Sequence, residues 1–317
     1  MESNFSLDGK RVFLAGGSGL VGGALLSQLE QRSCAVLSPS HEDLDLLDER
    51  STTEYFSDMR PDVAILAAAR VGGIGANQSQ PYDFLMDNLR MEINFMSAAH
   101  EANVERLGFL GSSCIYPKLA PQPLAESALL TGPLEPTNTG YAMAKLSGIE
   151  MVNAVRAQFG RPWISLLPSN LYGPGDNFNL DSSHVVPAML RKFHEAKESA
   201  ARNVVLWGSG KVKREFLHSK DAASGIIFAM ENYNGDSPLN IGYGQDVSIA
   251  DLASIVSRVV GFDGNIEWDP SMPDGVPRKL LDSSRINALG WSPTVELEPG
   301  LTQTYAWMIE SSSTLRQ

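Results

Sequence analysis

A tyrosine and a lysine in the middle of the chain stand at a spacing that suits proton transfer. In Tyr141-Ala-Met-Ala-Lys145 the two residues are four positions apart, so on a helix their side chains share one face. A free tyrosine, with a pKa of about 10, is a poor acid–base catalyst at neutral pH. A nearby ammonium favours the phenolate, and we expect it to lower that pKa into a useful range. Because this spacing is common by chance and more often lies on a surface, it needs support from other residues.

A serine motif upstream of this pair supplies such support. Gly111-Ser112-Ser113-Cys114 directly follows an apolar segment, 107–110, that we expect to be a strand. Parallel α/β sheets bind their ligands beyond the carboxyl ends of the strands. A hydroxyl at Ser112 could therefore hydrogen-bond a substrate carbonyl beside Tyr141.

A glycine-rich turn near the start of the chain predicts a dinucleotide site. It fits G-x-G-x-x-G from Gly17 and G-x-x-G-x-x-G from Gly16, between an expected strand at 11–15 and an amphipathic helix at 20–31. Glycine permits the tight turn and the close approach of a pyrophosphate, to which the helix offers free N–H groups and a positive dipole end. The expected contacts are Gly16, Gly17, Ser18, Gly19, Leu20, Val21 and Gly22.

The end of the expected second strand favours NADPH over NADH. Sites that prefer NAD usually place an acidic residue there to hold the ribose 2′-hydroxyl. Here Ser38, Ser40 and His41 stand at the tip, although Glu42 and Asp43 follow closely. Hydroxyls and an imidazole can hydrogen-bond a 2′-phosphate, which a carboxylate at the tip would repel. The alternative is an ordinary polar loop with relaxed cofactor choice.

The expected elements around these motifs alternate between strands and helices. Short apolar segments at 34–37, 63–67 and 163–167 join the two strands already named, and helical patterns cover 82–102 and 141–159. This rhythm predicts an α/β fold: a doubly wound parallel sheet (Rossmann) with a smaller mixed α/β substrate-binding lobe. The predicted limits are 1–173 for the dinucleotide-binding domain, to which about 215–245 returns, and 174–214 with 246–317 for the lobe.

Composition narrows the class of protein. The 317 residues carry a formal charge of −12, which argues against a nucleic-acid surface. No apolar run is long enough to span a bilayer, and residues 1–10 lack the apolar core of a signal peptide. With two cysteines, Cys34 and Cys114, no disulfide framework is implied, and we expect no metal site. These features predict a protein of the reducing cytoplasm.

Basic residues nevertheless gather late in the chain. The clusters are Arg191-Lys192, Lys211-Val-Lys213-Arg214 and Arg278-Lys279. They are either solvated surface charge or a site for a small anion.

Beyond these features, motifs along nearly the whole chain resemble the GDP-L-fucose synthase family, a group of extended short-chain dehydrogenases/reductases that act on GDP-4-keto-6-deoxy-D-mannose. Serine-serine-cysteine combined with Asp-Asn-Phe and a downstream histidine is the selective part of the likeness. The matching motifs are Val71-Gly-Gly-Ile74, Ser112-Ser-Cys-Ile-Tyr-Pro117, Tyr141-Ala-Met-Ala-Lys145, Asn170-Leu-Tyr-Gly-Pro174, Asp176-Asn-Phe178, His184-Val-Val-Pro187, Trp207-Gly-Ser-Gly210, Arg214-Glu-Phe216 and Pro273-Asp-Gly275.

The resemblance implies three steps in one pocket: epimerisation at C3 and at C5 beside the 4-keto group, then reduction of C4 by NADPH. It implies Cys114 and His184 as the pair that exchanges carbon-bound protons on opposite faces of the sugar, residue types that suit this task. It also implies Tyr141 as proton donor to the C4 oxygen, Lys145 as its partner and a contact of the nicotinamide ribose, and Ser112 as a ligand of the keto oxygen. Without the resemblance, a lone cysteine is usually a small buried hydrophobe and a lone histidine usually structural.

Binding residues follow from the same resemblance. Besides the residues already named, we expect cofactor contacts at Leu110, Gly111, Ser113, Pro168, Ser169, Asn170, Leu171 and His184. The GDP-sugar contacts are expected at Asn177, Val185, Lys192, Trp207, Arg214, Asp274 and Lys279. The chain departs from the family's pattern at Lys192, Ser18 and His41, where bacterial members often carry arginine. A lysine at 192 loses the bidentate geometry of arginine on phosphate.

Two other readings stay open. A 4,6-dehydratase would need an acid–base carboxylate pair where Ser113 and Cys114 stand, and a 4-epimerase would keep NAD tightly bound without net oxidation of NADPH. From a different class, a dinucleotide sensor without catalysis could dispense with Tyr141 and Lys145.

Apolar residues in excess of one buried face around 83–99 and 143–155 predict a homodimer, since relatives pair through these helices.

Overall fold

A computed structural model describes residues 5–180, 182–272 and 274–311, and its largest element is a parallel sheet. The six strands lie in the order β2-β1-β3-β4-β5-β9, and every neighbouring pair is parallel. Side chains of β3, β4 and β5 are buried along the whole strand, because helices cover both faces of the sheet. The bounds are β1 Arg11–Ala15, β2 Ala35–Leu37, β3 Val63–Leu66, β4 Arg106–Leu110, β5 Ile164–Pro168 and β9 Leu239–Ile241.

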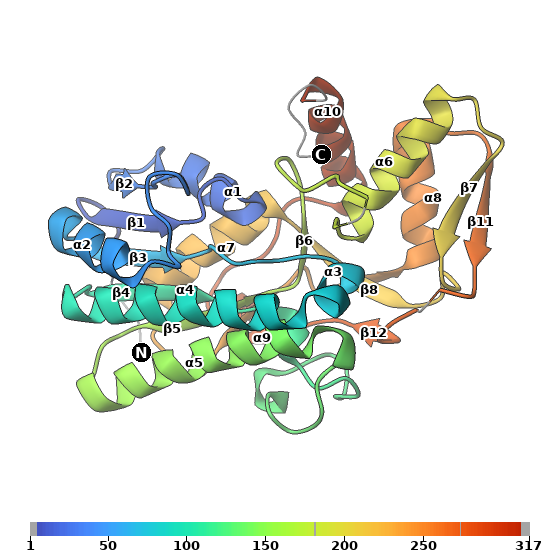
Figure 1. Cartoon of the computed structure of the whole chain (residues 1–317). Helices are drawn as coiled ribbons and strands as arrows, with labels where there is room; N and C mark the ends of the chain where they lie inside the picture. Colours follow the sequence, from blue (N-terminus) through green and yellow to red (C-terminus); the bar gives the residue numbers. More distant parts are fainter. Residues whose placement is uncertain (1–4, 181, 273, 312–317) are drawn as a thin grey trace.

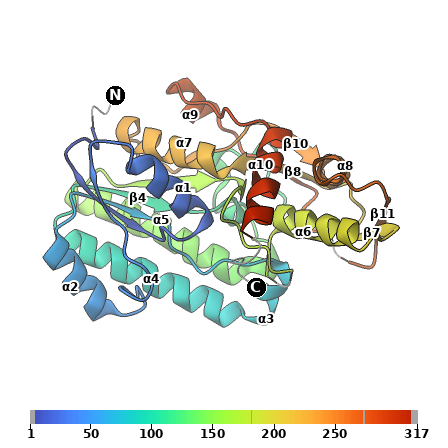
Figure 2. The same cartoon turned by 90° about the horizontal axis from the view of Figure 1, so that it is seen from above.

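Helices form a layer on each face of this sheet (Figure 2). On one face, α1 (Leu20–Leu29) packs against α7 (Ser219–Asn232). On the other, α4 (Pro81–Glu101) lies between α2 (Glu49–Met59) and α5 (Thr139–Phe159). The strand order reverses beside β1, since β2 pairs with one of its edges and β3 with the other. A crevice at such a reversal is where open α/β sheets bind nucleotides.

A second body lies at one end of the molecule (Figure 1). Its four-stranded sheet is mixed: β8 (Lys213–His218) pairs antiparallel with β10 (Asp246–Ser248) and parallel with β12 (Arg278–Lys279) and β6 (Asn170–Tyr172). The parallel pair β7 (Asn203–Trp207) and β11 (Asn265–Asp269) lies beside it. Three helices complete its own apolar core: α6 Val185–Glu198, α8 Ile249–Val260 and α10 Leu297–Glu310.

One connection between the two bodies lies late in the chain. The segment 278–288 runs from β12 back to the main sheet, where Leu281 forms a bridge with Leu124 and α9 (Ser284–Ala288) contacts β9. The remaining short helices are α3 Ile74–Ser79, η1 Ser113–Ile115, η2 Glu126–Ala128 and η3 Pro136–Asn138. No helix in the described ranges is long and apolar enough to cross a membrane.

The predicted fold class is confirmed, and each strand and helix named from the sequence is present with ends shifted by a few residues. The other α-helices, α2, α3 and α6 to α10, were not predicted by range. α2 is a polar helix that buries Thr52 and Phe56, so few apolar residues in its sequence indicate a helix. The domain limits stay a prediction; within 215–245, α7 and β9 pack in the main sheet's layers, whereas β8 belongs to the second sheet.

Candidate active site

The glycine turn between β1 and α1 forms a cradle that side chains would fill. Gly16 has a φ of +92°, and a Cβ there would lie 2.7 Å from the backbone nitrogen of Ala68. A Cβ on Gly22 would overlap the carbonyl of Gly16. The first turn of α1 has no acidic residue, and its N-cap, Gly19, makes no side-chain cap, so its N–H groups can bind an anion. This cradle fits a pyrophosphate.

The side chains after β2 do not all have the arrangement expected for contacts with a 2′-phosphate. Ser38 lies against Gly17, next to the cradle. Ser40, however, donates its hydroxyl to the Asp43 carboxylate at 2.7 Å, and these hydrogen bonds hold the pKa of Asp43 below its usual value. The His41 side chain is 80% exposed. The structure therefore places a carboxylate beside Ser40, whose part in 2′-phosphate binding stays a prediction.

The carboxyl edge of the sheet brings the remaining predicted cofactor contacts together. Leu110 ends β4 and is followed by Gly111 and Ser113, and the segment 168–171 runs from the last residue of β5 into β6. The Asn170 amide donates to the Glu215 carbonyl at 2.7 Å, which ties this segment to β8. The buried Ser169 hydroxyl has no hydrogen-bond partner within the described part of the chain.

Tyr141 and Ser112 meet beside the end of β4. Ser112 caps η1 by accepting from the Cys114 N–H at 3.2 Å, and its side chain is hydrogen-bonded to Tyr141. The expected lowering of the Tyr141 pKa is wrong for this structure. Burial, followed by negative charge at Cys114 and Glu92, raises the pKa of Tyr141 above its usual value, although the Ser112 hydrogen bond acts in the opposite direction. Tyr141 is thus a protonated phenol at neutral pH.

Lys145 has a partner that sequence reasoning missed. Its ammonium lies 3.2 Å from Oε1 of Glu92 on α4, with both side chains almost fully buried. It also lies 4.8 Å from the ring centroid of Phe109 and 5.9 Å from that of Tyr141. Burial raises the pKa of Glu92 to about 7, and the Lys145 charge opposes this rise. One signal was available: Glu92 follows the buried residues Phe84 and Asn88 at intervals of four.

Cys114 and His184 come from different bodies of the molecule and share a cationic neighbour. The Lys279 ammonium on β12 lies 3.7 Å from the Cys114 sulfur. The protein that surrounds His184, and then the Lys279 charge, lower the pKa of this imidazole. Burial lowers the pKa of the Arg214 guanidinium, and the charge at Cys114 opposes this change. An ammonium in this place stabilises negative charge on sulfur.

The predicted GDP-binding residues form a second cluster in the smaller body. Trp207 is 60% exposed, and the Lys192 ammonium lies 5.6 Å from its ring centroid. Asp274 accepts from the Ser209 N–H at 2.7 Å and lies close enough to Arg214 to influence its pKa. An exposed indole with an ammonium over its ring is suited to a nucleotide base with its phosphates.

Three of the predicted residues need separate mention. Asn177 donates to the Ser182 hydroxyl at 2.9 Å, so its amide is engaged within its own loop. Val185 is the first residue of α6, directly after His184. Pro273 of the Pro273-Asp-Gly275 motif lies outside the described residues.

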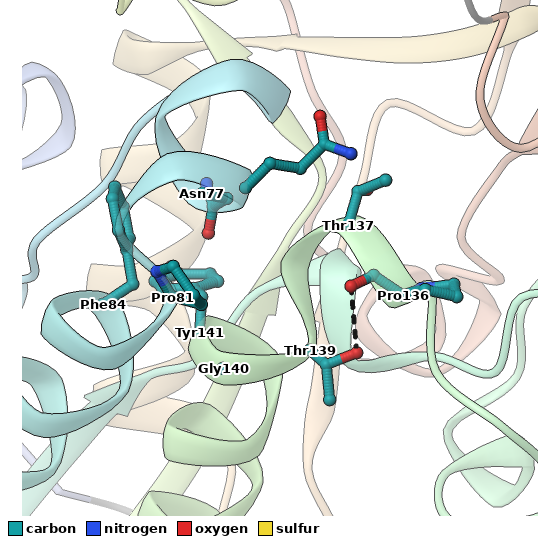
Figure 3. Close-up of a pocket in the computed structure, with 9 residues that line it drawn as sticks. Asn77, Pro81, Phe84, Pro136, Thr137, Thr139, Gly140 and Tyr141 are labelled. Carbon is teal, nitrogen blue, oxygen red and sulfur yellow. Dashed lines mark hydrogen bonds between the residues drawn. The ribbon is translucent and has the colours of Figure 1, made fainter.

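A pocket of about 320 Å³ lies beside Tyr141, between α3, the start of α4 and η3 (Figure 3). Pro81, Phe84 and Pro136 supply apolar walls. The buried Asn77 donates its amide to the carbonyls of Gly72 and Gly73 at 2.8 and 3.1 Å, while its Oδ1 has no partner among the described residues.

Comparison with known proteins places this geometry among relatives. Residues 12–242 match the NAD dependent epimerase/dehydratase family. GDP-L-fucose synthase 1 of Arabidopsis thaliana is 49% identical over 310 residues, which cover 98% of this chain and 96% of that protein. GDP-L-fucose synthase of Escherichia coli K12 is 48% identical over 317 residues, which cover 97% of this chain and 99% of that one.

A solved structure extends the likeness to three dimensions. The GDP-L-fucose synthetase from Naegleria fowleri bound to NADP matches with a TM-score of 0.90 at 27% identity, and the match covers 100% of this chain and 98% of that chain. Both the main sheet and the smaller body are therefore shared.

Proposed function

Because the chain belongs to the NAD dependent epimerase/dehydratase family and, within it, to the GDP-L-fucose synthases, we propose that it converts GDP-4-keto-6-deoxy-D-mannose to GDP-L-fucose with NADPH. The observation that carries this proposal is the meeting of two sets of groups. Cys114 and His184 converge on Lys279 from one side, and Ser112 and Tyr141 are hydrogen-bonded on the other.

Epimerisation falls to the first set. The 4-keto group acidifies the hydrogens on C3 and C5, so a base of ordinary strength can remove them. Cys114, beside the Lys279 ammonium, removes the proton from one face of the ring, and the imidazolium form of His184 gives a proton to the same carbon from the opposite face.

Reduction falls to the second set. The glycine cradle would hold the pyrophosphate of NADPH, which would supply the hydride for C4. Ser112 donates a hydrogen bond to the keto oxygen, and Tyr141 then gives its proton to that oxygen as negative charge develops. Trp207, Lys192, Arg214 and Asp274 hold the GDP half in the smaller body, so the sugar lies between the two bodies.

Location and assembly are part of the same proposal. Both cysteines are free thiols, which agrees with a reducing cytoplasm. Large apolar side chains on α4 and α5 are exposed, among them Tyr82, Ile93 and Met143. We infer that these helices pair with their copies in a homodimer.

Incubation with GDP-4-keto-6-deoxy-D-mannose and NADPH tests the proposal. We expect GDP-L-fucose by NMR, with one NADPH oxidised for each sugar converted. Product that forms without net oxidation of NADPH would indicate a 4-epimerase instead, and cofactor binding without any product would indicate a sensor.

A further inference from the structure

Glu92 is a carboxylate enclosed by the protein at the back of the reduction site. It is 1% exposed, and α4, which carries it, runs alongside α5, which carries Lys145 and Tyr141 (Figure 1). The Lys145 ammonium at 3.2 Å is its ionic partner, while neither carboxylate oxygen has a hydrogen-bond partner among the described residues. Burying a carboxylate costs free energy unless the charge is paired. A functional role would explain why this carboxylate is kept.

The packing around Glu92 is built to admit this pair. Gly148 lies in the middle of α5, where glycine costs about 1 kcal/mol relative to alanine. A Cβ at Gly148 would lie 2.9 Å from Oε2 of Glu92 and would collide with the Phe109 ring. The same ring takes the Lys145 ammonium at 4.8 Å from its centroid. Gly148 and Phe109 thus make the space in which the ammonium is fixed.

The charge of Glu92 contributes to the pKa of Tyr141. Burial raises the pKa of the phenol most, and the charges of Cys114 and then Glu92 raise it further. The groups that face Tyr141 are therefore Glu92 on α4, Lys145 on α5, and Ser112 and Cys114 at η1. Reduction of a ketone requires a phenol that still carries its proton, and an uncompensated ammonium would favour loss of that proton.

We propose that Glu92 is a positioning residue for reduction, which fixes the Lys145 ammonium against Tyr141 and offsets its charge so that Tyr141 begins the step protonated. This inference rests on the proposed function, since it assumes that Tyr141 donates to a keto oxygen. Lys145 then remains available for a ribose hydroxyl without turning its neighbour into a phenolate.

The test is the pH profile of Glu92→Gln, which keeps the shape and removes the charge. The reduction rate should be retained below the Tyr141 pKa and lost above it, so a lower pKa moves the alkaline limb of kcat to lower pH. We expect a shift of about one unit or more and a roughly tenfold lower kcat above the new limb. KM for the sugar nucleotide should stay within about twofold. Glu150→Gln on the exposed face of α5 is the matched control and should keep the wild-type limb.

Two further arms make the result decisive. Deuterium exchange at C3 and C5 in heavy water without NADPH should be unchanged in Glu92→Gln, because it depends on Cys114 and His184. Glu92→Asp keeps the charge but shortens the side chain by one methylene. It should shift the alkaline limb in the same direction as Glu92→Gln, by a smaller amount. An unchanged alkaline limb in a folded Glu92→Gln overturns the inference, and Glu92→Asp decides in the same way if the glutamine variant does not fold. Failure of the wild type to form GDP-L-fucose would instead overturn the proposed function.

Discussion

Tyr141 is the residue whose single oxygen atom separates the two chemistries of the site. Tyr141→Phe keeps the ring and removes the proton donor. We expect NADPH oxidation to fall by about 10²–10⁴ fold, the usual effect of losing one positioned acid. NADPH binding, followed by fluorescence, should persist, as should deuterium exchange at C3 and C5. Tyr55→Phe, whose ring packs against Phe13, is the control. Near-normal turnover in Tyr141→Phe would contradict this role.

Cys114 should be separable from Tyr141 by a change of one atom. Cys114→Ser replaces a thiol of pKa about 8.5 with a hydroxyl that hardly ionises, beside the same Lys279 ammonium. We expect deuterium incorporation at C3 and C5 to fall at least about a hundredfold. Reduction of C4 should continue and yield an unepimerised 6-deoxy sugar nucleotide, identified by NMR.

The other cysteine supplies the control for this experiment. Cys34 is distant in sequence from Cys114, and its thiol donates to the Leu29 carbonyl. Cys34→Ser should therefore behave as the wild type does. If Cys114→Ser still forms GDP-L-fucose at the wild-type rate, Cys114 is a packing residue and the base lies elsewhere.

Sequence reasoning reached some residues of the site and missed others for a physical reason. Tyr141, Lys145 and Ser112 were identified because helical spacing and a strand end bring them together locally. The pKa of Tyr141 was predicted in the wrong direction, because spacing reveals the cation at Lys145 but not the burial or the counter-charge at Glu92. Glu92 reaches the site through the packing of α4 on α5, a contact between distant segments that no local pattern encodes.

At the scale of elements, the turn before α1 makes a prediction about the cofactor. In Gly16→Ala, a side chain at φ +92° would press on the backbone of Ala68, so the turn must move away from the end of β3. We expect the dissociation constant for NADPH to rise by at least about tenfold, measured by titration calorimetry.

A matched glycine separates backbone strain from the collision. Gly9 also has a positive φ, +73°, but a Cβ there meets nothing within 4 Å. Gly9→Ala should therefore lose some stability and keep its affinity for NADPH. Equal losses of affinity in the two variants would show that strain, rather than the shape of the cradle, controls binding.

Elements were more predictable than their partners. The strands of the main sheet were foreseeable because parallel strands covered on both faces are continuously apolar, as in β3. The second sheet was not, since β6, β10 and β12 are short and their pairing with β8 joins segments from distant parts of the chain. Lys279 therefore appeared in sequence as part of a basic cluster, and only the register of β12 on β8 brings it to Cys114.

For the whole molecule, the exposed apolar face of α4 and α5 predicts the state of assembly. Ile93 is 49% exposed on α4, so a charge there would lie within the proposed dimer interface. Ile93→Asp should convert a dimer into a monomer in light scattering coupled to size exclusion. Leu289→Asp changes a side chain exposed to a similar degree, 43%, beyond α9 and should leave the dimer intact. A wild type that is monomeric at micromolar concentration would contradict the proposed interface.

The late position of Lys279 in the chain has a consequence for folding during synthesis on the ribosome. The last strand of the nucleotide-binding sheet, β9, ends at Ile241, whereas the cation beside Cys114 emerges with β12 and is fixed only when 278–288 returns to the main sheet. At usual elongation rates these events are on the order of seconds apart. The same part of the chain supplies Leu281, Ile286 and Trp291 to the apolar cores on the two faces of the main sheet. Completion of the nucleotide-binding body and placement of the cation beside Cys114 are therefore coupled, late events of synthesis.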